Sequence, residues 1–463
     1  MQDKQSWRRV CIKDVCESII DCVNKTAPTV EYQTEFKMIR TTNVKSGWID
    51  LSDVKYVTQE VFERWTRRAI PKKGDVILTR EAPLGEVGIL RTNDKIFLGQ
   101  RLVQYRANSK YLDNKFLLYA FQENDLQSQI KALGSGATVE HMRVPDAEKL
   151  TLRLPPLTMQ HTIADILSAY DDLIENNARR IAVLEEMAQM LYDEWFVKFR
   201  FPGYERVKMV ESELGMIPEG WEVARLGDIA IEIRRSINPE SVDPETPYFG
   251  LEHLPRKSIA LADWGTAKTV QSTKLVFKKG EILFGKIRPY LHKVGIAPLD
   301  GVCSSDTIVI GAKQDQYRSL LLNCVSSDHF VAFASKTSQG TQMPRANWDV
   351  LATFIIAIPP PELLSLFNDF VESTVDSIIN IIFSNRNLRR TRDLLLPKLI
   401  SGEIDVSSWV GEDAEVAAQE LAASVVGTAN GYDTIGGIGR KVAEVGPMEP
   451  IEKEELEWHS LWE

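Results

Sequence analysis

The chain repeats itself along its length, and this duplication constrains the fold more than any other feature. Three pairs of segments carry the repeat: WRRVCIKDV (7–15) with WEVARLGDI (221–229), KKGDVIL (72–78) with KKGEILF (278–284), and LPP (154–156) with IPP (358–360). Partner segments lie about 205 residues apart, far beyond the length of a solenoid unit. The sequence therefore predicts a duplicated unit, in which each copy consists of a domain and the connector that follows it.

The second part of each unit has the pattern of a long helix. Prolines that suit a helix start precede a run in which apolar residues recur at alternating intervals of four and three, the spacing of a coiled-coil seam. The first seam comprises Ile163, Leu167, Tyr170, Ile174, Asn177, Ile181, Leu184, Ala188, Leu191 and Trp195. The second, weaker seam comprises Phe367, Val371, Thr374, Ile378, Ile381, Asn385, Leu388, Arg392, Leu395 and Leu399.

Two seams in one chain, separated by a globular segment, pair most simply with each other. A duplicated unit that closes on itself gives an antiparallel pair with pseudo-twofold symmetry. Each seam contains one asparagine, and a lone polar residue in an apolar seam commonly fixes register. We hypothesise that Asn177 faces Asn385; the alternative is that each faces solvent or another partner.

The first part of each unit is mixed, with short apolar runs such as DVIL (75–78) and TIVIG (307–311) between Gly, Pro and polar turns. The predicted fold is therefore α+β, with two similar mixed α/β domains separated by two long helices that pair as an antiparallel coiled coil. The predicted boundaries are a first domain at 1–155, a spacer helix at 156–200, a linker at 201–215, a second domain at 216–358, a second spacer helix at 359–403 and an acidic tail at 404–463.

The net charge of −10 is concentrated at the C-terminus. Residues 404–463 contain 13 acidic and 3 basic residues, a balance of −10, which leaves 52 of each sign in 1–403 out of totals of 65 and 55. The body is neutral overall and can still carry basic faces, which are what phosphate contact requires.

Signatures of secretion, metal binding and catalysis do not occur. The start MQDKQSWRRV has no apolar signal core, and no apolar run approaches the ~20 residues that cross a bilayer, so we expect a cytoplasmic protein. The five cysteines form no CxxC pair, which favours free thiols over a metal site or disulfides. GEILFGK (280–286) resembles a phosphate loop, but Ile287 replaces the hydroxyl residue that would bind magnesium. We expect no catalytic residue, no metal and no cofactor in this chain.

Four segments resemble the specificity subunits of type I restriction-modification systems. They are LPPLTMQHTIADILSAYDDLIENNARRIAVLEEMAQMLYDEWFVKFRFPGYE (154–205), SELGMIPEGWEVARLGDI (212–229), NLRRTRDLLLPKLISGEIDV (387–406) and GDVILTREAPLGEVGI (74–89). The first and third resemble the central and distal conserved regions of that family. The tail after Val406 departs from the family pattern, and we expect it to be a solvated extension, with docking of a partner as the alternative.

The resemblance implies a non-catalytic DNA-binding subunit. Each domain would read one half of a bipartite site in double-stranded DNA, and the helices would set the distance between the halves. Two modification subunits would dock on the helices and methylate adenines with S-adenosylmethionine, and restriction subunits would cleave with ATP and Mg²⁺. The alternative is a coiled-coil scaffold that does not read DNA. Glu185, Glu186 and residues 193–195 are expected on the helix exterior, either as docking points or as a solvated face.

The candidate DNA contacts are polar residues in turns, because bases are read by Arg, Asn and Gln while Lys, Arg, Ser and Thr hold phosphates. In the first domain they are Arg80, Gln100, Arg101, Thr138, His141 and Arg143, the last three in the Gly-rich segment 134–143. In the second they are Lys286, Arg288, Tyr290 and Lys293, with Gln339, Thr341, Gln342 and Arg345 in the segment 338–345. For each residue the alternative is an ordinary solvated side chain, and Glu81 could simply pair with Arg80.

Overall fold

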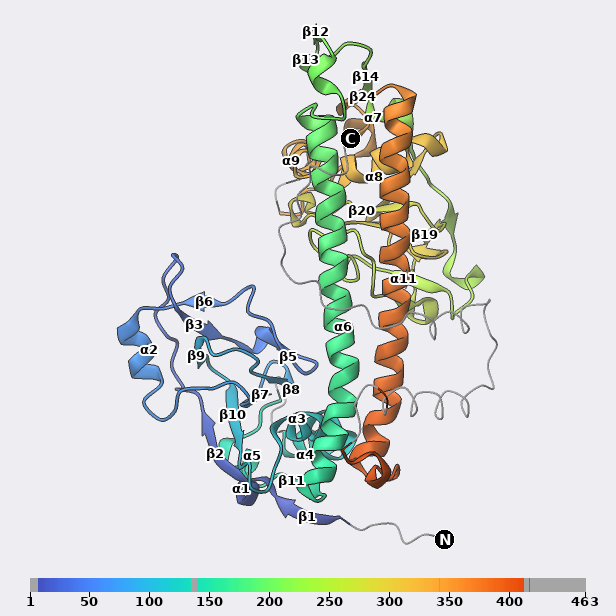
Figure 1. The fold of residues 1–463 in the computed structure, drawn as a ribbon. Coiled ribbons are helices and arrows are strands. Elements are labelled where there is room, and N and C mark those ends of the chain that lie inside the picture. Colours follow the sequence, from blue (N-terminus) through green and yellow to red (C-terminus); the bar gives the residue numbers. More distant parts are fainter. Residues whose placement is uncertain (1–6, 135–139, 341, 412–415, 417–463) are drawn as a thin grey trace.

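The computed structural model describes residues 7–134, 140–340, 342–411 and 416, and it contains two mixed α/β domains flanking a pair of long helices (Figure 1). Helix α6 (Leu157–Tyr192) follows the first domain and α11 (Pro361–Ile400) follows the second. A π-helical turn (Asp193–Val197) extends α6. The predicted fold class is confirmed, and the expected helices at 156–200 and 359–403 correspond to α6 and α11.

The first domain is built on an antiparallel sheet with the strand order β2-β10-β7-β8. Its strands are β2 (Cys16–Asp21), β7 (Val76–Arg80), β8 (Leu84–Ile89) and β10 (Leu102–Ala107). A second sheet, ordered β6-β3-β9, contains β3 (Phe36–Ile39), β6 (Lys55–Tyr56) and β9 (Lys95–Leu98). The remaining elements are β1 (Arg8–Cys11), α1 (Ile12–Val15), β4 (Val44–Lys45), β5 (Trp48–Ile49), α2 (Gln59–Trp65), α3 (Asn114–Gln122), α4 (Asn124–Leu133), α5 (Val144–Ala147) and β11 (Thr151–Leu154), which pairs with β1.

The second domain repeats this plan, with an antiparallel sheet in the order β15-β23-β20-β21. Its strands are β15 (Ala230–Glu232), β20 (Ile282–Gly285), β21 (Val294–Ile296) and β23 (Thr307–Ala312). The helices are α7 (Leu226–Ile229), α8 (Arg318–Ser326), α9 (Asp328–Lys336) and α10 (Trp348–Leu351). Strand β14 (Glu222–Arg225) pairs with β24 (Ile355–Ile358) as β1 pairs with β11.

The second sheet differs between the two domains, and a hairpin precedes the second domain. The second domain has the order β16-β19-β22-β17-β18, formed by β16 (Ser236–Ile237), β17 (Pro247–Phe249), β18 (Gly265–Thr266), β19 (Lys274–Phe277) and β22 (Gly301–Cys303). A hairpin of β12 (Met209–Ser212) and β13 (Gly215–Pro218) links α6 to the second domain.

The main sheets of the two domains each contain a central strand that follows the repeated KKG turn. Gly74 and Gly280 have φ angles of 93° and 84°, the left-handed region that glycine tolerates best, and each turn leads into a central strand. In β7 the side chains of Val76, Ile77 and Leu78 are fully buried. A short apolar run behind a tight turn therefore forms a buried strand in both repeats.

Helices α6 and α11 run antiparallel and pack along each other (Figure 1). Asn177 Nδ2 donates a hydrogen bond of 2.8 Å to Asn385 Oδ1, which confirms the predicted pairing of the two asparagines. The main predicted seam residues are all buried or half-buried, namely Ile163, Leu167, Ile174, Asn177, Ile181, Leu184, Leu191, Ile378, Ile381, Asn385, Leu388 and Leu395. The seam is thus the contact face, as the spacing predicts.

Each domain completes its hydrophobic core with residues from both helices. Leu395, Leu399 and Ile400 of α11 pack with the first domain beside Ile163 and Leu167 of α6. At the other end, Ile181 of α6 and the beginning of α11, including Phe367 and Ile378, pack with the second domain. Each of the two helices therefore contributes apolar residues to both cores.

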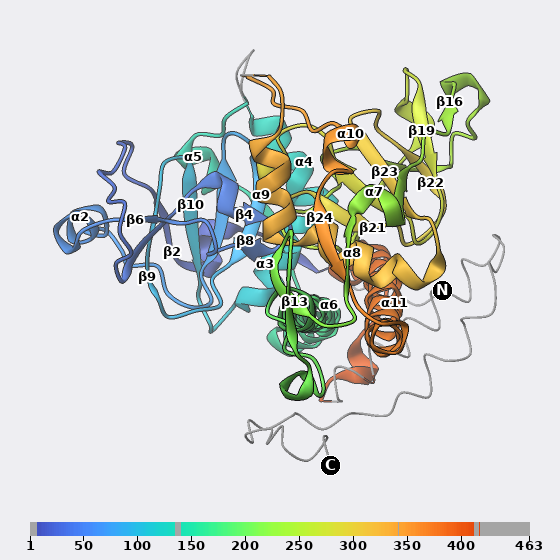
Figure 2. The same cartoon turned by 90° about the horizontal axis from the view of Figure 1, so that it is seen from above.

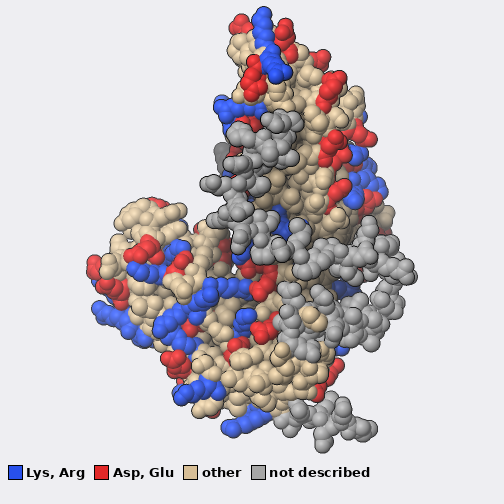
Figure 3. Space-filling model, viewed as in Figure 1, with Lys and Arg blue, Asp and Glu red and all other residues tan. Residues whose placement is uncertain are grey.

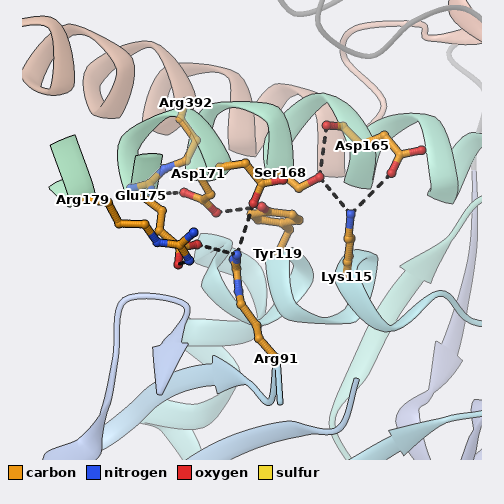
Figure 4. Close-up of polar contacts among 10 residues, drawn as sticks. Arg91, Lys115, Tyr119, Asp165, Ser168, Asp171, Glu175, Arg179 and Arg392 are labelled. Atoms are coloured by element: carbon orange, nitrogen blue, oxygen red, sulfur yellow. Dashed lines mark hydrogen bonds and ion pairs between the residues drawn. The ribbon is translucent and has the colours of Figure 1, made fainter. Parts of the chain in front are cut away.

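A polar cluster lies within the first of these cores, where α3, α6 and α11 meet (Figure 4). The Asp171 side chain, only 3% exposed, accepts a 2.7 Å hydrogen bond from the Tyr119 hydroxyl and forms an ion pair with Arg392. Burial, with Asp171 beside it, raises the pKa of Tyr119 well above its ordinary value. Arg392 occupies a seam position in the sequence, so an ion pair replaces an apolar contact there.

Removing Arg392 should be costly because it leaves the Asp171 carboxylate buried without its cation. We expect Arg392→Met to lower the free energy of unfolding by about 3–5 kcal/mol. Urea titration of the full chain measures this, with Arg390→Met, an exposed position on the same helix, as the control. Equal stability of the two variants would contradict this account of the cluster.

Candidate nucleic-acid interface

Three separate segments of the first domain meet at the end of β7. The backbone N–H of Arg80 donates to the Arg101 carbonyl at 2.8 Å, and the N–H of Met142 donates to the Arg80 carbonyl at 3.0 Å. Glu81 and His141 form an isolated antiparallel bridge. The segments around residues 80, 101 and 142 therefore form one surface, which we call the first reading turn (residues 80–83, 99–101 and 140–143).

The second domain builds the same arrangement at the end of β20. The N–H of Lys286 donates to the Asp306 carbonyl at 2.8 Å, and the N–H of Ala346 donates to the Lys286 carbonyl at 2.9 Å. Ile287 bridges Arg345, as Glu81 bridges His141. We call this surface the second reading turn (residues 286–293, 304–306, and 338–346 except 341).

An ion pair ties each reading turn together, but it joins different segments in the two domains. In the first, Glu81 at the strand end pairs with Arg101 at 3.3 Å. In the second, Asp306 stands near the position equivalent to Arg101 and pairs with Arg345 at 3.5 Å. The suggested pairing of Glu81 with Arg80 is therefore wrong. The turns share a backbone plan and differ in side-chain charge, as two surfaces that read different sequences would.

Two candidate residues point into the protein. The Arg80 guanidinium donates a 3.0 Å hydrogen bond to the Met142 carbonyl, and its Nε is buried without a hydrogen-bond partner. Lys293 Nζ donates to the Leu251 carbonyl, and burial together with nearby Arg256 lowers the pKa of its ammonium. Both side chains therefore stabilise their turns through hydrogen bonds to backbone carbonyls of the domain.

The other described candidates lie on the surface of the turns. Arg101, His141, Arg143, Arg288, Tyr290, Gln339, Gln342 and Arg345 are exposed, while Gln100 and Lys286 are half-buried. Arg143 donates to Asp146 at 2.8 Å, and this hydrogen bond lowers the pKa of the Asp146 carboxyl. Thr138 and Thr341 lie outside the described residues. The structure thus brings the candidate segments of each domain together, although the sequence did not separate outward from inward side chains.

Sequence reasoning missed His292, which supports the second reading turn. Its Nε2 lies 2.8 Å from the Ser326 carbonyl and its Nδ1 lies 3.3 Å from Asp328. The short 3₁₀ helix η6 (Pro289–Leu291) lies between Arg288 and His292, which both have a φ of 51°. Such left-handed conformations are unfavourable for residues other than glycine and must be stabilised by their surroundings. No sequence motif marks the position.

The expectation that Glu185 and Trp195 lie on the helix exterior is wrong. The Glu185 carboxylate accepts hydrogen bonds from Ser258 and from two backbone N–H groups of the second domain. The Trp195 side chain is packed in the second core, beside Phe367. Both residues face the second domain, which covers this end of α6.

Both reading turns lie on the side of the molecule away from the helix pair. In Figure 2, α5 and α10, the short helices that follow the two Gly-rich segments, lie opposite α6 and α11. The face that carries the helices shows Lys and Arg interspersed with Asp and Glu (Figure 3). One elongated partner that lies along the free side could reach both turns.

Among the described residues, no three His, Cys, Asp or Glu side chains gather as a metal site would require. In the same part of the chain, no helix is long and apolar enough to span a membrane.

The left-handed backbone of Arg288 predicts that two substitutions at this position differ in stability. Arg288→Gly should stabilise the chain relative to Arg288→Ala by about 1 kcal/mol, because alanine retains the unfavourable φ of 51° and glycine does not. Thermal unfolding of the two variants measures the difference. A lower melting temperature for the glycine variant would show that the backbone at 288 is unstrained.

The arrangement matches proteins of one functional class. Residues 4–186 match the family model of the type I restriction modification DNA specificity domain. The chain is 27% identical over 384 residues to the type I restriction enzyme MjaIX specificity subunit of Methanocaldococcus jannaschii, covering 78% of this chain and 87% of that protein. It is 25% identical to the EcoDI specificity subunit of Escherichia coli, covering 65% of this chain and 73% of that one.

A solved structure supports the fold. The crystal structure of a type I restriction-modification S subunit from M. genitalium superimposes with a TM-score of 0.52 at 15% sequence identity, over 86% of this chain and 97% of that chain. The duplicated domains, the paired helices and the matched sequences agree. Along most of its length the chain is similar to the specificity subunits of type I restriction-modification systems.

Proposed function

We propose that the chain is the sequence-reading subunit of a type I restriction-modification complex, with each reading turn reading one half of a bipartite site in double-stranded DNA. The observation that carries this proposal is the pair of equivalent three-segment turns on one side of the molecule. Exposed Arg, Gln and Tyr side chains supply the hydrogen-bonding groups that distinguish bases and hold phosphates.

The chemistry belongs to partner subunits in this proposal. The chain itself is non-catalytic, and two modification subunits dock on the helical region to methylate adenines with S-adenosylmethionine. Restriction subunits complete the complex and cleave DNA with ATP and Mg²⁺. This chain binds none of these cofactors, and the complex acts in the cytoplasm, where the host DNA lies. The similarity of the chain to specificity subunits of type I restriction enzymes supports this assignment.

Single-molecule sequencing of host DNA tests the proposal directly. With this chain and its modification subunit co-expressed, we expect methylated adenines at one two-part motif with a fixed gap. Omitting the chain should abolish them. Methylation that is absent, or unchanged without the chain, would favour a coiled-coil scaffold that does not read DNA.

Arg288→Ala tests the second reading turn more closely. We expect specific DNA binding to weaken by about 1–3 kcal/mol if Arg288 contacts a base, with relaxed specificity confined to one half of the motif. Binding of the complex to labelled duplexes at two salt concentrations measures both affinity and salt dependence.

The control is Arg318→Ala, an exposed arginine at the start of α8, a helix that packs against α11. It should leave affinity unchanged. Unchanged affinity and salt dependence for Arg288→Ala would remove Arg288 from the interface.

A further inference from the structure

We propose that Glu185 of α6 is a positioning residue that fixes the tilt of the second domain on the helix, and thereby the gap between the two half-sites. This inference rests on the function proposed above. It concerns how the distance between half-sites is held constant, whereas the reading turns concern which bases are read.

Glu185 is bound to the second domain through three hydrogen bonds. Its Oε1 accepts from Ser258 Oγ at 2.7 Å, from the Ile259 N–H at 2.8 Å and from the Ala260 N–H at 3.0 Å. Hydrogen bonds to a charged acceptor are stronger and more directional than neutral ones. Burial nonetheless raises the pKa of this carboxyl, as expected for a group enclosed between helix and domain. The loop 258–260 is therefore held at one place on α6.

Two backbone hydrogen bonds connect this loop and the residue before it to β21 and to the second reading turn. The Ile296 N–H donates to the Ile259 carbonyl at 3.0 Å, which joins the loop to β21. The Lys257 N–H donates to the His292 carbonyl at 2.9 Å. His292 ends the short helix η6, which begins after Arg288. Displacing the loop on α6 would consequently displace the turn that carries Arg288 and Tyr290.

The first domain is held to the same helix in a comparable way (Figure 4). Arg91 lies 3.2 Å from Asp172 and 3.3 Å from Glu175 of α6, and its guanidinium stacks on the Trp48 ring at 3.7 Å. Arg91 follows β8, and the opposite end of β8 adjoins the first reading turn. Carboxylates of α6 thus bind both domains. Each contact lies beside the outer strand of that domain's main sheet, which is β8 in the first domain and β21 in the second.

Small tilts matter because base pairs are closely spaced. A tilt about the Glu185 contact shifts the reading turn relative to the DNA, and neighbouring base pairs are separated by a rise of only ~3.4 Å. The length of the helix pair sets the approximate separation of the domains. The anchors must then fix the tilt of each domain for a single gap to be preferred.

The test compares gap preference in Glu185→Ala, Glu185→Gln and wild type, each as the full chain co-expressed with its modification subunits. Single-molecule sequencing gives the ratio of methylation at sites with the native gap to sites one base pair longer or shorter. We expect Glu185→Ala to reduce this ratio about tenfold, because three hydrogen bonds to a charged acceptor are lost, while the bases in each half-site stay the same. Glu185→Gln retains an acceptor oxygen and should restore most of the preference.

Glu186→Ala, an exposed neighbour on the same helix, is the matched control and should keep the wild-type ratio. If Glu185→Ala abolishes methylation, Ser258→Ala decides, because it removes one donor and leaves the helix intact; a reduced ratio supports the proposal. Proportional loss at every gap, or an unchanged ratio in whichever variant decides, overturns it. A wild-type chain without any two-part motif would overturn the proposed function as well.

Discussion

The antiparallel contact between α6 and α11 is the interaction on which the rest of the structure depends. Apolar seams supply the burial, and two polar contacts between the helices accompany it. Asn177 meets Asn385, and Asp171 meets Arg392 together with Tyr119 of the first domain. Slipping either helix by one turn would leave these buried groups without partners, which costs more than the pairs themselves contribute. A single register is thereby favoured for the whole chain.

That register places two copies of one backbone plan on the same side of the molecule. The hydrogen bonds around Arg80 and Lys286 are equivalent, yet the ion pairs beside them join different segments. The framework can stay constant while exposed side chains vary, because the backbone bonds that shape the turns do not involve those side chains. Duplication followed by divergence of the turns is enough to produce a reader of two different half-sites.

The sequence predicted the parts of the structure that repeat locally. Helical seams, the KKG turns and the Asn177–Asn385 contact follow from spacing, since period and symmetry relate residues without knowledge of the fold. Glu185 could not be found this way, because its three partners lie more than seventy residues away and two of them are backbone groups, which carry no sequence signal. Arg80 and Lys293 lie in turns that the sequence singled out, but whether their side chains point outward depends on tertiary neighbours such as Met142 and Leu251.

Because both helices contribute to both hydrophobic cores, the two domains complete their cores in a fixed order during synthesis. The second domain packs with residues up to Ile382, whereas the first needs Leu395, Leu399 and Val406, which the ribosome makes later. Domains usually finish folding in the order in which they are made. Here the first domain must wait with part of its apolar surface uncovered until nearly all of the chain has emerged. The first domain, although it is translated first, is consequently the domain whose apolar surface most needs protection during synthesis.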